Sequence, residues 1–263
     1  MPGHDFDRSV VSMRLLTEFA GEYRVPPAQV LNGTRVAEDQ LYDSTGLVSA
    51  EQELQLIGNL VKRVPPDKAP GLAAGRRYHF TTFGALGLAM MSSPTMLEAL
   101  RLGLRYFHLT AALTRFSLIE SEGQAHVRID ADMLAPEIRR FILERDIAAF
   151  VTLQRDMFGP EPVIQDLAFS FDAPPDSQAY TAFFGLAPRF GAEHCEVACS
   201  LDTLRQALPQ ANDLARQAAE DQCQRMLHLR SPRKDLVDTV RQEITMQLAQ
   251  RPRMEDIAAR LHM

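Results

Sequence analysis

A change of periodicity after Ala112 constrains the fold of this chain more than any other feature of its sequence. Before it, apolar residues recur at helical spacing; after it, the segments "TRFSLIES" and "QAHVRID" alternate polar and apolar residues and are joined by "SEG". Two alternating runs around a short polar turn predict a β-hairpin, because alternation places one set of side chains on one face. The residues expected on its covered face are Phe116, Leu118, Val127 and Ile129.

Helical periodicity predicts the elements before the hairpin. Residues 8–64 are expected to form helices joined by short turns, and in "SAEQ" Ser49 and Gln52 have the spacing of a capping box. The segment "FGALGLAMM" is apolar on all sides, which is typical of a buried helix. Ser93 and Pro94 are predicted to begin the helix that follows it.

Helical and alternating patterns also follow the hairpin. An amphipathic helix is predicted from Pro136 to Met157, "VIQDLAFSF" predicts a third strand, and "DSQAYTAFFG" predicts a short helix. "PRFG" and "CEVACS" predict two further strands, and residues 212–229 predict another helix. The expected apolar positions of that helix are Leu214, Ala218, Met226 and Leu227. Strands grouped against helices on one side indicate the α+β class, with a helical N-terminal layer packed on a small antiparallel sheet.

The charge of the chain limits the partners that it can bind. With 28 Lys and Arg against 34 Asp and Glu, the net charge is -6, which argues against a broad basic face for phosphates. Three cysteines without zinc-ligand spacing are typical of reduced thiols in the cytosol. The N-terminus has acidic residues and no long apolar core, and no stretch approaches a membrane span. We therefore expect a cytoplasmic protein without a membrane partner.

The last residues of the sequence carry a second pattern. Residues 235–249 are predicted to form one amphipathic helix, and "MEDIAARLHM" follows after a turn. Met254, Ile257, Ala258 and Leu261 have the spacing of the first helix of a helix-turn-helix. The recognition helix that would enter the major groove does not follow in this sequence. We therefore expect no specific DNA binding by this chain alone, and DNA contact through the full-length protein only.

These segments carry a resemblance to a known family. The tail with "MEDIAARLHM" resembles the opening of the DNA-binding domain of AraC/XylS-type bacterial transcription regulators. Upstream, "FGALGLAMMSSPTMLEAL" and "YTAFFGLAPRFGAEHCEVACSLDTLRQALP" resemble the N-terminal domain of the branch labelled arabinose-binding-like. The resemblance implies an effector-binding and dimerisation domain over residues 1–230. It also implies a helical linker and the truncated start of an all-α DNA-binding domain over 231–263.

The same resemblance implies partners and a mode of action. A homodimer is expected to bind a small-molecule effector and thereby to control a C-terminal helix-turn-helix, without enzymatic activity. Arabinose is not inferred from the label of the family.

Methionines and aromatic residues, including Met96, gather around the "FGALGLAMM" segment. Two interpretations remain open for them: a packed core, or the lining of an effector pocket between the helices and the sheet, where methionines adapt to an apolar guest. Three nearby arginines, Arg101, Arg105 and Arg115, are either solvated or placed to bind a carboxylate of an apolar or amphipathic effector. The expected ligand-binding residues are Phe80, Met90, Met91, Arg101, Arg105, Tyr106, Phe107 and Phe116.

Two histidines, His79 and His108, leave open a haem- or gas-sensing domain of similar shape. Neither belongs to an HxxxH or HExxH motif, which would place two ligands on one helix face, so no metal and no cofactor are expected. His194 and Cys195 are neighbours and would point to opposite faces of a strand, so no catalytic residue is expected. A ligand-free dimerisation module is the third alternative.

Overall fold

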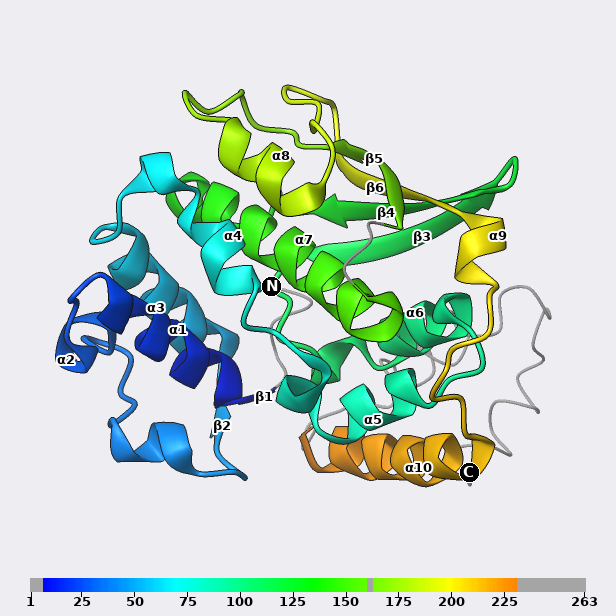
Figure 1. Cartoon of the computed structure of the whole chain (residues 1–263). Helices are drawn as coiled ribbons and strands as arrows, with labels where there is room; N and C mark the ends of the chain where they lie inside the picture. The colour runs from blue at the N-terminus through cyan, green and yellow to red at the C-terminus, as the bar shows by residue number, and fades with distance from the viewer. Residues whose placement is uncertain (1–6, 160–162, 231–263) are drawn as a thin grey trace.

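The molecule combines helices with two small antiparallel sheets (Figure 1), which confirms the predicted α+β class. This computed structural model describes residues 7–159 and 163–230. The helix predicted for residues 235–249 and the predicted helix-turn-helix opening lie outside these residues. The helices are α1 (Val11–Glu22), α2 (Pro27–Val30), η1 (Asp39–Tyr42), α3 (Ala50–Val61), η2 (Pro66–Lys68), α4 (Pro70–Gly75), η3 (Phe80–Phe83), α5 (Ala85–Met91), α6 (Met96–Arg105), η4 (Phe107–Leu109), α7 (Pro136–Phe158), α8 (Gln178–Phe184), α9 (Leu201–Leu204) and α10 (Asp213–Arg230).

The larger sheet contains the predicted hairpin. Its strands are β3 (Arg115–Ser121), β4 (Gln124–Asp130), β5 (Ile164–Ala168) and β6 (Cys195–Ser200), in the antiparallel order β3-β4-β6-β5. Leu118 lies opposite Val127, and Glu122 and Gly123, both with positive φ, close the two-residue turn that suits twisted strands. The expected "PRFG" strand is reduced to one bridge with β5. A separate pair consists of β1 (Arg8–Ser9) and β2 (Leu47–Val48).

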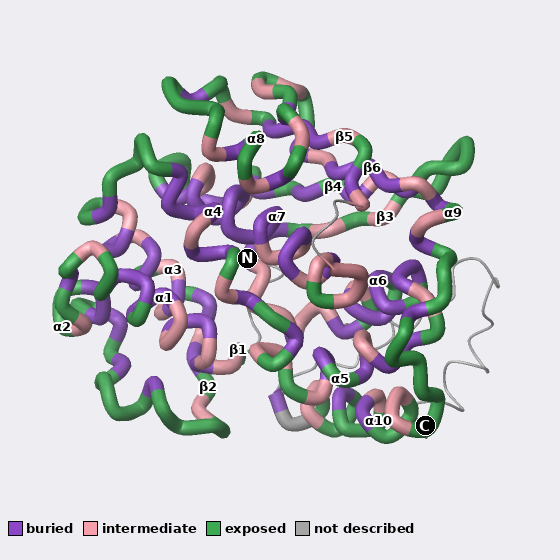
Figure 2. Tube along the Cα trace, in the orientation of Figure 1, coloured by how far each residue is buried: buried purple, intermediate pink, exposed green. Residues whose placement is uncertain are grey.

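α7 is the central helix of the fold. Phe141, Ile142 and Val151 on this helix belong to the same apolar core as Val127 and Val197 of the sheet. Figure 2 shows that α7 is buried over most of its length, between the N-terminal helices and the sheet. Among the described helices, α7 included, none has the length and hydrophobicity needed to cross a bilayer.

The predicted capping box at the beginning of α3 is confirmed, and two glycines mark the ends of later helices. Ser49 begins α3 as one half of a capping box, because its Oγ accepts from the Gln52 backbone N–H at 3.2 Å while Gln52 Oε1 accepts from the Ser49 N–H at 2.8 Å. α7 and α8 end at Gly159 and Gly185, which have φ values of 92° and 77°. Glycine favours these conformations because it has no Cβ.

The predicted start of α6 is wrong by two residues. Thr95 is the N-cap residue, and its Oγ1 accepts from the Glu98 backbone N–H at 3.2 Å. Ser93 instead donates its hydroxyl hydrogen to the carbonyl oxygen of Ala89 at 2.9 Å and so closes the preceding helix, α5. α5 is also not buried on all sides, since Leu88 is 52% exposed.

α10 packs against α5 with a face that agrees with the predicted one only in its C-terminal half. Ala219 and Cys223 are buried in this contact, whereas the predicted positions Leu214 and Ala218 are exposed, Leu214 by 79%. Met226 and Leu227 pack against the same cluster, as predicted. The apolar residues of α10 from Ala219 onward are therefore covered within the chain by α5 and its neighbours. The homodimer itself stays a prediction.

Candidate functional site

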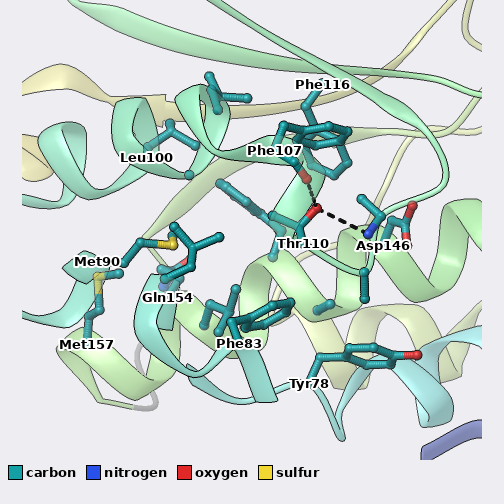
Figure 3. A pocket seen from close by; sticks show the side chains of 18 of the residues that line it. Tyr78, Phe83, Met90, Leu100, Phe107, Thr110, Phe116, Asp146, Gln154 and Met157 are labelled. Carbon is teal, nitrogen blue, oxygen red and sulfur yellow. Dashed lines mark hydrogen bonds between the residues drawn. The ribbon is translucent and has the colours of Figure 1, made fainter. Parts of the chain in front are cut away.

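An apolar cavity of about 100 Å³ lies between α5, α6, α7 and the beginning of β3 (Figure 3). Three aromatic rings on its rim, those of Phe83, Phe107 and Phe116, are half-buried, so the cavity is bounded on one side by residues that reach the surface. Its walls are almost wholly apolar. An apolar concave site of this kind is the default location for a small ligand.

Helical periodicity builds one wall of the cavity. Met96, Leu100 and Leu104 follow one another at four-residue spacing on α6, so that they share one side of the helix and line the cavity. Leu86 and Met90 on α5 have the same spacing and also line it. The Met90 side chain reaches over Gly103 of α6, where a Cβ would lie only 3.1 Å from Met90 Cε.

The opposite wall comes from α7 and the hairpin. Ala149, Leu153 and Met157 line the cavity from α7, again at four-residue spacing. The rings of Phe107 and Phe116 lie 5.6 Å apart between centroids and are tilted by 48°, an arrangement favourable for aromatic pairs. These two rings connect the end of α6 to β3.

Three of the eight predicted ligand-binding residues line the cavity: Met90, Phe107 and Phe116. The other three apolar ones do not. Phe80 is buried beneath α5, where its carbonyl oxygen leaves no space for a Cβ on Gly87. Met91 lines a separate small hollow beside Leu208. Tyr106 is buried against α10 and its hydroxyl donates to Glu220 at 3.3 Å.

The predicted arginines also lie away from the cavity. Arg101 forms ion pairs with Glu98 and Glu120, each at 2.7 Å, and Arg105 pairs with Glu220 at 2.7 Å. Arg115 is exposed and lines another hollow. The guanidinium groups of Arg101 and Arg105 pair with acidic side chains outside the cavity, which explains why proximity in sequence did not place these two residues in it.

The α7 wall was missed by the sequence interpretation, although its signal is present. Ala149, Leu153 and Met157 form a regular apolar line along the predicted helix. Gln154 is one of the buried polar residues of this wall, together with Arg145 and Asp146. Tyr78 and Thr110 also line the cavity but lie in connecting segments, where no periodic pattern marks them.

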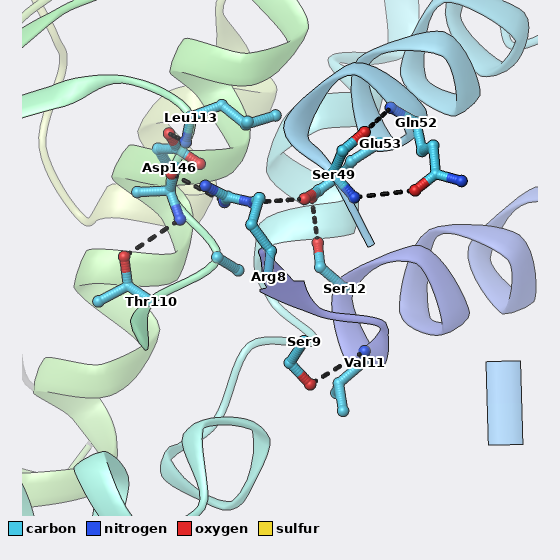
Figure 4. A network of polar contacts seen from close by, with 12 residues as sticks. Arg8, Ser9, Val11, Ser12, Ser49, Gln52, Glu53, Thr110, Leu113 and Asp146 are labelled. Carbon is cyan, nitrogen blue, oxygen red and sulfur yellow. Dashed lines mark hydrogen bonds and ion pairs between the residues drawn. The ribbon is translucent and has the colours of Figure 1, made fainter. Parts of the chain in front are cut away.

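A buried network of charges adjoins the cavity and joins distant segments (Figure 4). Glu53 of α3 is fully buried and accepts hydrogen bonds from Arg8 Nε at 2.9 Å, from Ser12 Oγ at 2.6 Å and from Arg145 Nη1 at 3.3 Å. One carboxylate thus links β1, α1 and α7. A buried carboxylate needs such partners to offset its lost hydration.

Arg145 brings this network to the cavity wall. Its Nε and Nη2 lie 2.9 and 2.8 Å from Asp146 Oδ1, and Nη2 also donates to the carbonyl oxygen of Ala111 at 3.1 Å. The other Asp146 oxygen accepts from the Thr114 hydroxyl at 2.7 Å. Since Nη1 pairs with Glu53, each guanidinium nitrogen of Arg145 already has an acceptor within the protein.

Protonation states at this wall follow from burial and pairing. Burial raises the pKa of Tyr78 to about 12, so its hydroxyl, 2.8 Å from Ser12 Oγ, stays protonated at neutral pH. Burial alone would lower the pKa of Arg145, but the negative charges of Asp146 and Glu53 stabilise the protonated guanidinium. The net effect is a raised pKa. The cavity wall therefore contains the neutral phenol of Tyr78 and the fully paired guanidinium of Arg145.

The histidines and the cysteine considered for metal or covalent chemistry lie elsewhere. His79 pairs with Asp156 at 3.0 Å, and His108 lines a different hollow. Burial raises the pKa of the Cys195 thiol, which disfavours the reactive thiolate. In the ranges that the structure describes, no group of three or more His, Cys, Asp or Glu side chains is arranged to hold a metal ion.

One family model matches most of this chain. Residues 25–208 match the family model described as the arabinose-binding domain of AraC transcription regulator, N-term. The match covers more than half of the chain and contains the elements that enclose the cavity.

Individual relatives extend over most of the chain. An uncharacterized HTH-type transcriptional regulator of Mycobacterium bovis is 29% identical over 266 residues, covering 100% of this chain and 77% of the relative. The ornithine utilization regulator of Pseudomonas aeruginosa is 25% identical over 249 residues, covering 94% and 73%. The crystal structure of transcriptional regulator CdpR from Pseudomonas aeruginosa superposes with a TM-score of 0.60 at 19% identity, covering 91% of this chain and 77% of that chain. At this identity the superposition shows a shared fold alone.

Proposed function

Because this chain belongs to the family of the arabinose-binding N-terminal domain of AraC transcription regulators, we propose that it is the effector-sensing region of such a regulator and that its effector is a small, uncharged, apolar molecule. The cavity between α5, α6 and α7 carries the proposal. Effector binding shifts the equilibrium between arrangements of the DNA-reading domains in a cytoplasmic homodimer. No bond is made or broken in this mechanism.

The volume of the cavity limits the size of the effector. A dry apolar cavity of about 150 Å³ in another protein binds benzene, so a cavity of about 100 Å³ admits a single ring only if side chains move. Met90, Met96 and Met157 line the cavity, and methionine side chains adapt their shape readily. We therefore favour a ligand of about one ring or a short branched chain.

The electrostatics of the cavity limit the charge of the effector. An ionised group is costly to bury without a partner, and the Arg145 and Asp146 charges at the wall already satisfy each other. The name of the Pseudomonas relative refers to ornithine utilization. A molecule with charged ends, such as ornithine, would find no unpaired charge among the described residues of this cavity wall, so we propose a different class of effector for this chain.

Thermal unfolding with two ligands of similar shape tests the proposal. Toluene and benzoate carry the same ring, but only benzoate is charged at neutral pH. A ligand that binds only the folded state stabilises it, by about 2.7 kcal/mol at 100 times its Kd, so we expect toluene to raise the Tm and benzoate to leave it unchanged. Stabilisation by benzoate alone would contradict the proposed ligand class, and no effect of either would contradict this cavity as the site.

A further inference from the structure

Two side chains are shared between the cavity and the contact of α5 with α10. Leu86 and Met90 line the cavity, and both pack in the apolar cluster that contains Ala219 and Cys223 of α10. α5 is therefore a thin layer, with the cavity on one side and α10 on the other. Figure 1 shows α5 lying directly along α10, away from the sheet.

The two halves of α10 are held differently. Near its beginning, the Asn212 backbone N–H donates to the Ser92 carbonyl oxygen at 2.9 Å, and Glu220 forms an ion pair with Arg105 at 2.7 Å. The polar contacts thus tie this half to the segment after α5 and to α6. Beyond Glu220, α10 contacts α5 through apolar side chains such as Cys223, and Gln224 is hydrogen-bonded to Tyr106 rather than to α5.

The last turn of α10 includes a poorly satisfied charge. Arg230 is only 9% exposed, and its Nη1 has no hydrogen-bond partner among the described residues. Burial, and after it the positive charge of Arg8, lowers the pKa of Arg230, which is the direction expected for a cation in an unfavourable place. The last turn of α10 therefore carries a buried cation whose hydrogen bonding is incomplete among the described residues.

We propose that a ligand in the cavity loosens the C-terminal half of α10 from α5, and that α10 is the output element of the sensor. This inference rests on the proposed function and specifies its regulation. Met90 occupies the space over Gly103, so a ligand that enters there displaces Met90 and Leu86 towards Ala219 and Cys223. Since α10 directly precedes residues 231–263, its loosening changes how the following DNA-reading region is presented.

Cys223 provides a natural reporter of this movement. It is fully buried in the contact of α5 with α10, and burial raises the pKa of its thiol to about 11, so alkylating reagents reach and modify it only when α10 opens. Cys195 and Cys199 are buried in β6 and report on opening of the sheet instead. The rate of alkylation by iodoacetamide can be followed separately for each thiol by mass spectrometry of the peptides.

Two perturbations fill the cavity independently. Toluene is added to the unaltered 263-residue chain, and Ala149→Phe places a ring in the cavity from α7, with Ala149→Ser as the control that adds little bulk. We expect each filling to speed the modification of Cys223 roughly tenfold, which lies within the usual range of coupling between sites, while Cys195 stays unchanged.

The outcomes separate this inference from the proposed function. An unchanged Cys223 rate, or equal acceleration of all three thiols, would overturn the coupling. If toluene raises the Tm without changing the rate at Cys223, the coupling fails and the proposed function stands. If Ala149→Phe speeds modification of Cys223 while toluene does not bind, the coupling stands and the proposed ligand class fails.

Discussion

Gly75 of α4 lies directly against the backbone carbonyl of Arg145 on α7. A Cβ at position 75 would overlap this carbonyl oxygen and would lie 2.6 Å from the Cβ of Ala148. One turn earlier, a Cβ on Gly71 would lie 2.5 Å from that of Glu144. Two glycines therefore let α4 cross α7 at close range, and this crossing sets the position of the chain that leads from α4 to the cavity.

Gly75→Ala should destabilise the fold because the added methyl group has no space. Overpacking of this kind costs about 1–3 kcal/mol, and here the obstacle is backbone, which yields less readily than a side chain. Gly58→Ala is the matched control, since Gly58 lies within α3 with no atom within 4 Å of the added Cβ. The control should gain up to about 1 kcal/mol, because alanine favours helices over glycine. Urea unfolding measures both, and equal effects of the two substitutions would contradict the close crossing.

Glu53→Gln should destabilise the fold by about 3 kcal/mol or more, because it leaves two buried guanidinium groups without their shared carboxylate. Arg8 and Arg145 are both less than a tenth exposed and both contact Glu53. Glu98→Gln is the control at the surface, where Arg101 keeps Glu120 as a partner, and should cost less than about 1 kcal/mol. Comparable losses from both variants in chemical unfolding would show that the buried network contributes little.

The stability of the fold should fall with pH in the alkaline range, partly because of Cys199. Burial raises the pKa of this thiol from 9.0 to about 12, so between these values the folded state retains a proton that the unfolded state has lost. Its contribution is complete below pH 9 and is lost as the pH rises through about 12, by roughly 1.4 kcal/mol per pH unit at most. Cys199→Val should reduce this slope. The slopes of the two proteins should agree between pH 6 and 8, and an unchanged alkaline slope would count against the buried thiol as its source.

Filling the cavity should abolish the thermal shift caused by toluene, whereas added bulk nearby should not. Ala149→Phe places its ring in the cavity, while Met91→Trp enlarges a residue of the same region that lines a separate hollow. We expect no toluene shift in the first variant and an undiminished shift in the second. If only Met91→Trp abolished the thermal shift, toluene would bind in the hollow beside Leu208 and not in the cavity.

Periodicity predicted the elements of this fold better than their contacts. Alternation around the hairpin located β3 and β4, and it also placed Leu118 and Val127 on the same face, because a strand has only two faces. The side chains of a helix point in all directions around its axis, so periodicity alone does not determine which side is buried. The apolar line of α10 was therefore traced through Leu214 and Ala218, although the contact with α5 selects Ala219 and Cys223.

The candidate site depended on information that local sequence does not contain. Met90 and Phe107 were correctly predicted to line the cavity, because the sequence around them is apolar and aromatic. Arg101 and Arg105 were predicted to line it as well, but their side chains point to acidic partners outside it. Arg105 pairs with Glu220, which is 115 residues distant in the chain. The orientation of a long charged side chain depends on partners that can be remote in sequence, so it is determined only when the chain has folded.

The ion pair of Arg8 with Glu53 bears on how this domain can be exchanged between proteins. The recognisable family pattern begins at residue 25, yet α1 contributes Leu16 and Phe19 to the core from before that point. At the other end, α10 covers α5 from beyond residue 208. A gene fusion that transplanted only the recognisable segment would carry two uncovered apolar faces and a buried carboxylate without one of its cations. We expect the portable module to be wider than its sequence signature, with both flanks inherited together.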